Sequence, residues 1–160
     1  QYQRDSRIGR TPNKSGKVLA TKKLFNHETS RHTEKVVKRF SLLNEGENLK
    51  ELFERLDKKT LKKLATKKHT CRRMIANSPS YTVLTLPDDL VHYSKNRILT
   101  VREMARLQSF DDSFEFLGKR TTGGNRRTKE TPQYTLVGNA VPPLLAKAIA
   151  DEIMRVLQLG

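Results

Sequence analysis

Apolar residues recur at helical spacing in the first half of the chain. Val36, Phe40 and Leu43 fall on one helical face, and Thr33 stands before them as a suitable N-cap. The next stretch follows the i, i+3, i+4, i+7 pattern, with apolar positions at Leu49, Leu52, Phe53 and Leu56. The pattern therefore predicts two amphipathic helices between residues 33 and 56.

The second half predicts one strand and two more helices. Residues 81–86, YTVLTL, are rich in β-branched and aromatic side chains and end at a proline, which favours a strand. Thr100 with Glu103 three residues later forms a capping box and predicts a helix start. The last helix is expected to begin near Ala140 or Val141. Its apolar face comprises Leu145, Ile149, Ile153 and Val156.

Residues 134–149, YTLVGNAVPPLLAKAI, have the composition of a helix start. Gly138 permits a sharp turn, and Asn139 is a favoured N-cap whose amide can also bind a ligand. The two prolines suit a first helical turn, where a missing N–H costs little. This start is either plain capping or one wall of a ligand pocket. The local residues by themselves favour capping.

The helices are well supported, whereas the evidence for strands is thin and no internal repeat is present. This mixture predicts a mixed α+β fragment whose main sheet lies elsewhere. Residues 1–22 are polar and basic and are interpreted as a tail or a cut end. No apolar stretch is long enough to span a membrane, and no signal peptide is recognisable.

Charge changes the picture, because 160 residues carry a net +15 and a pI near 10.2. Residues 1–73 hold 21 Lys+Arg against 8 Asp+Glu, and residues 74–160 hold 11 against 9, so the basic surface belongs to the first half. Residues 58–73 contain eight basic side chains and no acidic one. A solvated helix face would explain such a run, but with the overall asymmetry we favour contact with nucleic acid.

The sequence contains no recognisable set of residues for an independent active site. The chain has no phosphate-binding glycine loop, and no Ser/His/Asp set can be recognised. Cys71 is the single cysteine, so an internal disulfide is excluded. We interpret it as an incidental cysteine; the alternative is a reactive thiol whose pKa the neighbouring arginines lower. The histidines do not stand at metal-ligand spacing with Cys71, so zinc is not expected. They are His27, His32, His69 and His92.

Two long motifs carry a family resemblance. Residues 97–110, RILTVREMARLQSF, followed by 134–149, resemble the last two conserved motifs of DNA cytosine-5 methyltransferases. Residues 26–52 and 78–90 resemble the target-recognition region of that family. The resemblance implies a small target-recognition domain with few strands over 23–133, including a basic loop at 119–132. Residues 134–160 would then be a closing helix that packs on a Rossmann-like catalytic domain not contained in this chain.

The resemblance also implies residue roles. Asn139 matches an asparagine that contacts S-adenosyl-L-methionine, and Ala140 and Val141 continue that wall of the pocket. Thr82, or alternatively Thr85, matches a threonine that touches the DNA backbone near the flipped base. Residues organising the recognition domain are Arg97, Thr100, Arg102, Glu103, Arg106 and Gln108. Phosphate contacts are expected from Lys67, Lys68, Arg72, Arg73, Arg126 and Arg127.

The chain departs from the family pattern at three positions. Asp111 stands in place of a proline, Leu136 in place of a glutamine, and Tyr81 where proline is common. The glycine-rich cofactor loop, the Pro-Cys nucleophile and the Glu-Asn-Val motif of the family are not recognisable. In such an enzyme the cysteine attacks C6 of cytosine, which makes C5 nucleophilic, and the glutamate assists at N3. The chain is therefore expected to be inactive by itself.

The leading hypothesis is the DNA-recognition and cofactor-pocket-completing part of a DNA cytosine-5 methyltransferase, of a cytoplasmic, prokaryotic restriction-modification type. Its partners would be double-stranded DNA and a catalytic domain or subunit, and its cofactor S-adenosyl-L-methionine. One alternative is a non-catalytic DNA-binding protein derived from a methyltransferase. Another, argued from charge alone, is a basic RNA-binding protein.

Overall fold

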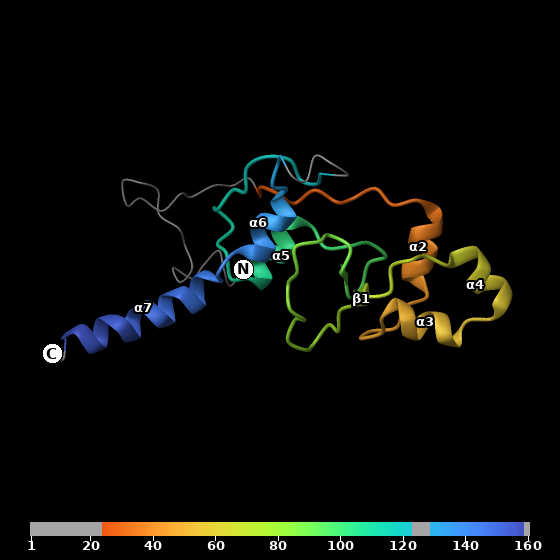
Figure 1. The fold of residues 1–160 in the computed structure, drawn as a ribbon, viewed down its shortest axis with the longest axis horizontal. Helices are drawn as coiled ribbons and strands as arrows, with labels where there is room; N and C mark the ends of the chain where they lie inside the picture. Colours follow the sequence, from red (N-terminus) through yellow and green to blue (C-terminus); the bar gives the residue numbers. More distant parts are fainter. Residues whose placement is uncertain (1–23, 123–128, 159–160) are drawn as a thin grey trace. The chain divides into compact units, whose positions relative to one another are not determined.

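A computed structural model describes residues 24–122 and 129–158 (Figure 1). The chain divides into two compact units. The central unit comprises residues 28–100, and the terminal unit joins the segment up to His27 with residues 101–160. The domain boundary expected after residue 133 thus falls inside the terminal unit. The first 97–110 motif also crosses from one unit to the other.

The central unit contains three helices, and both predicted amphipathic helices are confirmed. They are α2 (Glu34–Ser41), α3 (Leu49–Arg55) and α4 (Lys58–Leu64). Thr33 is the N-cap residue of α2, although its side chain makes no capping hydrogen bond. At α3, Asn48 and Glu51 form a reciprocal capping box, because each side chain accepts a hydrogen bond from the other's backbone N–H.

Two short parallel strands connect the distant parts of the central unit. Strand β1 (Arg72–Arg73) pairs with β2 (Leu90–Val91) in the register Arg72 to Leu90. Isolated antiparallel bridges extend this pairing from Arg72 to Asn48 and from Val91 to Ile98. A mixed α+β composition with few strands is therefore confirmed.

The strand predicted at 81–86 is wrong, because these residues lie in the loop between β1 and β2. Side-chain exposure still alternates along the segment, and Leu84 and Leu86 point outward. Local composition favoured an extended backbone, but a strand also needs a neighbour that pairs with it. The short strands β1 and β2, which flank this segment, pair with each other instead, so the segment remains a loop.

The core of the central unit comes from all of its elements. Its helices contribute Phe40, Leu49, Leu52 and Leu64, and the segment around the strands contributes Cys71, Leu90, Val91 and Ile98. The predicted apolar faces are thus directed inward. Val36, Phe53 and Leu56, at their edges, are half-buried.

The terminal unit contains α5 (Val101–Leu107), α6 (Gln133–Asn139) and α7 (Pro143–Gln158). The helix predicted to follow Thr100 is confirmed. The last helix, α7, starts at Pro143, shortly after the predicted Ala140 or Val141. The residues before it differ from the prediction, because residues 133–139 form the separate helix α6 and Ala140 is its C-cap. Asn139 is therefore the last residue of α6 and not an N-cap.

Helices α5 and α6 pack together around a small core. Val101, Ala105, Tyr134 and Val137 are fully buried there. Beside them Phe110, Phe114 and Phe116 form an aromatic cluster with ring centroids 4.8–5.0 Å apart. In contrast, α7 has no buried residue, and its apolar side chains Leu145, Ile149 and Ile153 are more than half exposed. Its packing on a catalytic domain remains a prediction.

Candidate DNA-recognition site and cofactor wall

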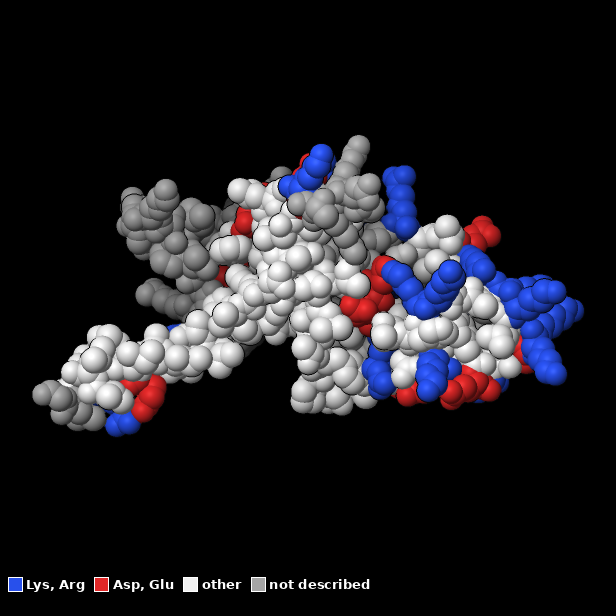
Figure 2. All heavy atoms as spheres, viewed as in Figure 1, with Lys and Arg blue, Asp and Glu red and all other residues white. Residues whose placement is uncertain are grey.

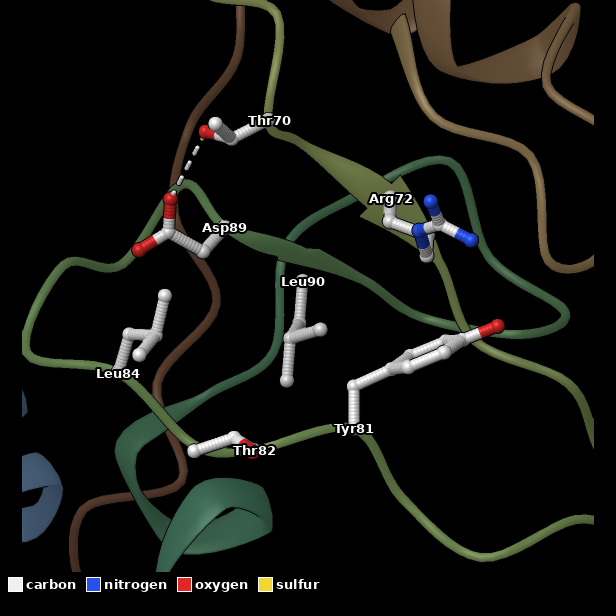
Figure 3. A pocket seen from close by; sticks show the side chains of 7 residues that line it. All are labelled: Thr70, Arg72, Tyr81, Thr82, Leu84, Asp89 and Leu90. Atoms are coloured by element: carbon white, nitrogen blue, oxygen red, sulfur yellow. Dashed lines mark hydrogen bonds between the residues drawn. The ribbon is translucent and has the colours of Figure 1, made fainter. Parts of the chain in front are cut away.

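The loop between β1 and β2 closes one side of an open pocket of about 270 Å³ in the central unit, which we call the loop pocket (Figure 3). Arg72 and Tyr81 stand on one side of it, and Thr70 and Asp89 stand on the other. The remaining lining residues are Thr82, Leu84 and Leu90. The pocket thus combines a guanidinium, a carboxylate, hydroxyls and apolar surface, which are the groups that proteins use to read base edges.

Arg72 is held in place on one wall of the loop pocket. Its Nη1 donates to the Gly46 carbonyl at 2.9 Å, and its guanidinium carbon lies 5.3 Å from the centre of the Tyr81 ring. A Glu51 carboxylate oxygen lies 3.6 Å from Nη2. On the opposite wall the Thr70 hydroxyl donates to Asp89 Oδ1 at 3.3 Å. The pocket's charged groups are therefore partly preorganised.

The two threonines expected near the DNA backbone differ in accessibility. Thr82 is exposed on the lining of the loop pocket, whereas Thr85 is half-buried. Thr82 therefore has the more accessible hydroxyl group of the two, and the contact of either with DNA stays a prediction.

The cations expected to bind phosphate differ in their surroundings where the structure describes them. Lys67 and Lys68 are exposed, and Lys68 forms an ion pair with Asp88. Arg126 and Arg127 lie outside the described residues. In the flanking basic loop, Lys119 pairs with Glu130, with 2.8 Å between Nζ and Oε2.

Arg73 is not available to a phosphate in this structure, which corrects the expectation for that residue. Only 6% of it is exposed, and its guanidinium donates to the Phe40 and His92 carbonyls and to Asn96 Oδ1. The cause is strand alternation: consecutive residues of β1 point to opposite faces, so Arg72 faces the pocket and Arg73 the interior.

Cys71 has no sign of reactivity. It is buried, and desolvation, followed by the charge of Asp89, raises the pKa of its thiol to about 12. The neighbouring cations Lys68, Arg39 and Arg73 oppose this shift without cancelling it. Because the thiolate is the nucleophilic form, this raised pKa argues against the reactive alternative for Cys71.

Arg102 organises the terminal unit from its centre. It is fully buried and donates through Nε to the Phe25 carbonyl at 3.0 Å and through Nη1 to the Asp111 carbonyl at 2.9 Å. Its Nη2 donates to the Phe114 carbonyl. The Asn26 side chain adds two hydrogen bonds to the backbone of Phe116, 2.8 and 2.9 Å long. Arg102 thus connects the segment preceding the central unit to the segment following it.

The other residues of the 97–110 motif also make structural contacts. Arg106 forms a bidentate pair with Asp112, with N–O distances of 2.8 and 2.6 Å, and Gln108 donates to the Val137 carbonyl at 3.2 Å. Arg97 is half-buried and donates to the Ile98 carbonyl. Thr100 is fully buried and Glu103 half-buried. The Gln108 bond ties α5 to the end of α6.

Asp111 takes the place of the family's proline in a way that the sequence did not predict. Asp111 is buried, and its carboxylate accepts hydrogen bonds from the backbone N–H and the hydroxyl of Ser113. This is a side-chain turn that restrains the backbone as a proline would. The Asp-x-Ser spacing was the available signal.

The expected cofactor wall lies at the junction of α6 and α7. Asn139 is exposed, Ala140 is half-buried, and Val141 is 62% exposed. The junction is anchored from α5's end, because the Ser109 hydroxyl accepts a hydrogen bond from the Leu144 N–H at 3.1 Å. Leu136, which replaces the family's glutamine, is also exposed. The three wall residues therefore form an accessible surface on a supported backbone.

Two classes of site find no support in the described residues. Within 24–122 and 129–158, no three His, Cys, Asp or Glu side chains come together as metal ligands would. In the same ranges no helix has the length and apolar character needed to cross a membrane.

Comparison with known proteins identifies the class. The family model for C-5 cytosine-specific DNA methylase matches residues 3–155, so the chain belongs to this family. The Type II methyltransferase M1.HphI of Haemophilus parahaemolyticus is 35% identical over 132 residues, covering 82% of this chain and 32% of that relative. The Type II methyltransferase M.DdeI of Desulfomicrobium norvegicum is 35% identical over 136 residues, covering 81% and 32%.

A third relative differs in length. The Type II methyltransferase M.AquIB of Picosynechococcus sp. is 36% identical over 130 residues, and the match covers 80% of this chain and 86% of that relative. The chain therefore spans about a third of the first two relatives but most of the third.

Proposed function

We propose that this chain is the DNA-recognition and cofactor-pocket-completing portion of a DNA cytosine-5 methyltransferase of the restriction-modification type. The whole enzyme would transfer a methyl group from S-adenosyl-L-methionine to a cytosine within a specific duplex sequence. The observation that carries the proposal is the α6–α7 junction, where the family's Asn139 motif stands exposed beside an uncovered apolar helix.

The residues at the α6–α7 junction fit one wall of a cofactor pocket. The Asn139 amide offers both a donor and an acceptor, and Ala140 and Val141 offer apolar surface beside it. Asn139, Ala140 and Val141 would bind and orient S-adenosyl-L-methionine, which supplies the methyl group when bound. These residues are accessible, so a surface of the catalytic portion could complete the pocket around the cofactor.

The apolar face of α7 supports a catalytic partner. Leu145, Ile149, Ile153 and Val156 are each more than half exposed on one face of a 16-residue helix. A continuous apolar stripe of this length usually packs against a core. The Rossmann-like catalytic portion, in the same polypeptide or in a second one, would cover it.

The central unit would recognise DNA. The loop pocket offers Arg72 and Asp89 to base edges and the Thr82 hydroxyl to a backbone phosphate. Lys67 and Lys68 lie exposed on the same unit and would add attraction for phosphate.

Methyl transfer by the separate and combined portions tests the proposal. The chain by itself should transfer no labelled methyl group from S-adenosyl-L-methionine to unmethylated duplex DNA. Addition of a catalytic portion that carries the glycine-rich loop and the Pro-Cys nucleophile should restore transfer. Turnover by the chain alone would contradict the proposed division of work.

Two variants refine this test. Asn139→Ala in the combined enzyme should weaken cofactor binding at least tenfold while leaving duplex binding unchanged. Lys147→Ala is the matched control, because Lys147 lies on the face of α7 opposite its apolar stripe. This variant should leave cofactor binding and duplex binding unchanged. If the catalytic portion restores no methylation although the chain binds duplex DNA, the non-catalytic DNA-binding function is the correct one.

A further inference from the structure

Helix α4 presents an exposed cluster of positive charge. Four of its seven residues are lysines, all exposed, and we call them the α4 lysine face: Lys58, Lys59, Lys62 and Lys63. The helix itself contains no acidic residue. Figure 2 shows lysine and arginine side chains gathered at this end of the central unit, at the right of the view.

This arrangement is unfavourable for the isolated helix. Lys58 with Lys62, and Lys59 with Lys63, are like charges at i, i+4, which destabilises a helix. Lys58 and Lys59 also stand in the first turn, where the helix dipole disfavours cations. In the described part of the chain, none of the four forms an ion pair. Asp57 provides some compensation at the start of the helix, because its side chain caps the Lys59 and Thr60 backbone N–H groups.

The α4 lysine face is nevertheless presented on a fixed support. Leu64, at the end of α4, is buried, and its carbonyl accepts a hydrogen bond of 2.9 Å from Nε of the buried Arg39 of α2. Leu61 and Thr60 are half-buried on the inner side of the helix. Packing on α2 therefore holds the apolar side of α4 inward and directs the lysines outward.

Three of the other four cations of the basic run make contacts within the protein, whereas Lys67 is exposed. Lys68 pairs with Asp88, Arg72 bonds the Gly46 carbonyl, and Arg73 is buried. The sequence places eight cations in one run, but the tertiary structure separates them. The four on α4 point outward without an ion pair to any described residue, whereas Lys68, Arg72 and Arg73 contact other groups of the protein.

We propose that the α4 lysine face binds the phosphate backbone of duplex DNA without reading its sequence. This inference rests on the proposed function and deepens it: the phosphate grip lies mainly on α4, and base reading falls to the loop pocket. Duplex DNA supplies the dense negative charge that would relieve the repulsion between the lysines. Phosphate contacts position a protein on DNA, whereas base contacts specify the sequence.

Salt-dependent binding of the full chain to a short duplex tests the inference. Binding is measured by fluorescence anisotropy over about 50 to 200 mM salt. Replacing the four α4 lysines by glutamine should reduce the slope of log K against log salt by about 3 to 4, since each phosphate contact contributes about 0.9. The loss should be equal for duplexes of different sequence.

A charge-matched variant controls for the lost net charge. Lys35→Gln, Lys38→Gln, Lys50→Gln and Lys95→Gln together remove four exposed lysines elsewhere in the central unit. This variant should retain a slope close to that of the unchanged chain. Folding is checked by circular dichroism, and the α4 variant should melt at the same temperature or higher, because the i, i+4 repulsion is gone.

The outcomes separate this inference from the proposed function. Equal slopes in the α4 variant and the control variant would overturn the α4 assignment while leaving DNA recognition intact. No duplex binding by the unchanged chain at low salt would instead contradict its recognition role as well. Tighter binding to single-stranded or double-stranded RNA than to duplex DNA would overturn the choice of partner.

Discussion

Burial gives three arginines of this chain three different functions. Arg102 is fully buried and bridges backbone carbonyls, Arg73 is buried beside β1, and Arg72 remains half-exposed at the loop pocket. A guanidinium has five donors, so it can satisfy several carbonyls that would otherwise be buried without partners. At this scale the residue type indicates the bonds that a side chain can make, and its surroundings decide which are made.

His32 predicts a dependence of stability on pH. Its Nε2 accepts a hydrogen bond of 3.3 Å from the Ile98 N–H, and burial first, then the charge of Arg97, lower its pKa. The unfolded chain therefore takes up a proton at a pH where the folded chain does not. Stability should be fully present above about pH 6.5 and decrease as the pH falls below it. Melting temperatures across this range check the prediction.

Two substitutions assign this pH dependence. His32→Gln should lower the melting temperature at neutral pH but flatten its decrease in acid, because glutamine does not titrate. His69→Gln, at an exposed position, should retain the decrease. An unchanged acid dependence in His32→Gln would show that another group is responsible.

At the scale of elements, the predictions succeeded where one face of a segment decides its structure. The α2 and α3 helices were predictable because their apolar spacing matches the buried face. The strand at 81–86 failed because local composition cannot show whether a pairing neighbour exists. The separate helix α6 before α7 was not predicted, because glycine and asparagine near 138–139 indicate a helix boundary without telling an end from a beginning.

The exposed face of α7 predicts an association that charge should disrupt. Ile149→Lys combined with Ile153→Lys should weaken binding of the chain to its catalytic portion roughly tenfold or more, since burial of apolar surface is replaced by burial of charge. The fold of the chain alone should not change, because both residues are exposed. Titration calorimetry with the catalytic portion measures the effect.

The control for this prediction lies on the polar face of the same helix. Gln158→Lys adds an exposed lysine away from the apolar stripe and should leave the association unchanged. Equal binding of the double variant and of the control would show that α7 is not the docking surface.

At the scale of the whole molecule, the chain is two compact units, to which we assign separate tasks as a proposal. The central unit holds the loop pocket and the α4 lysine face, and the terminal unit holds α7 and the residues proposed as the cofactor wall. The family match extends over both, from residue 3 to residue 155. This division predicts that DNA specificity can be moved separately from cofactor binding.

Exchange of the central unit tests this division. Replacing residues 28–100 by the corresponding segment of M.DdeI should give a combined enzyme whose methylated sequence follows the donor of that segment. Exchange of residues 133–158 is the control and should leave the methylated sequence unchanged. Bisulfite sequencing of treated DNA reads the result, and a site that stays with the terminal unit would contradict the prediction.

The sequence by itself determined the family, the amphipathic helices, the basic character of the first half and the Asn139 motif, because these depend on residue identity and spacing. Only the tertiary structure decided which basic residues remain free, since β1 turns Arg73 inward while α4 holds its lysines outward. It also gathered Arg72, Thr82 and Asp89 around one pocket. Contacts between residues distant in sequence depend on long-range packing, and local patterns carry no record of them.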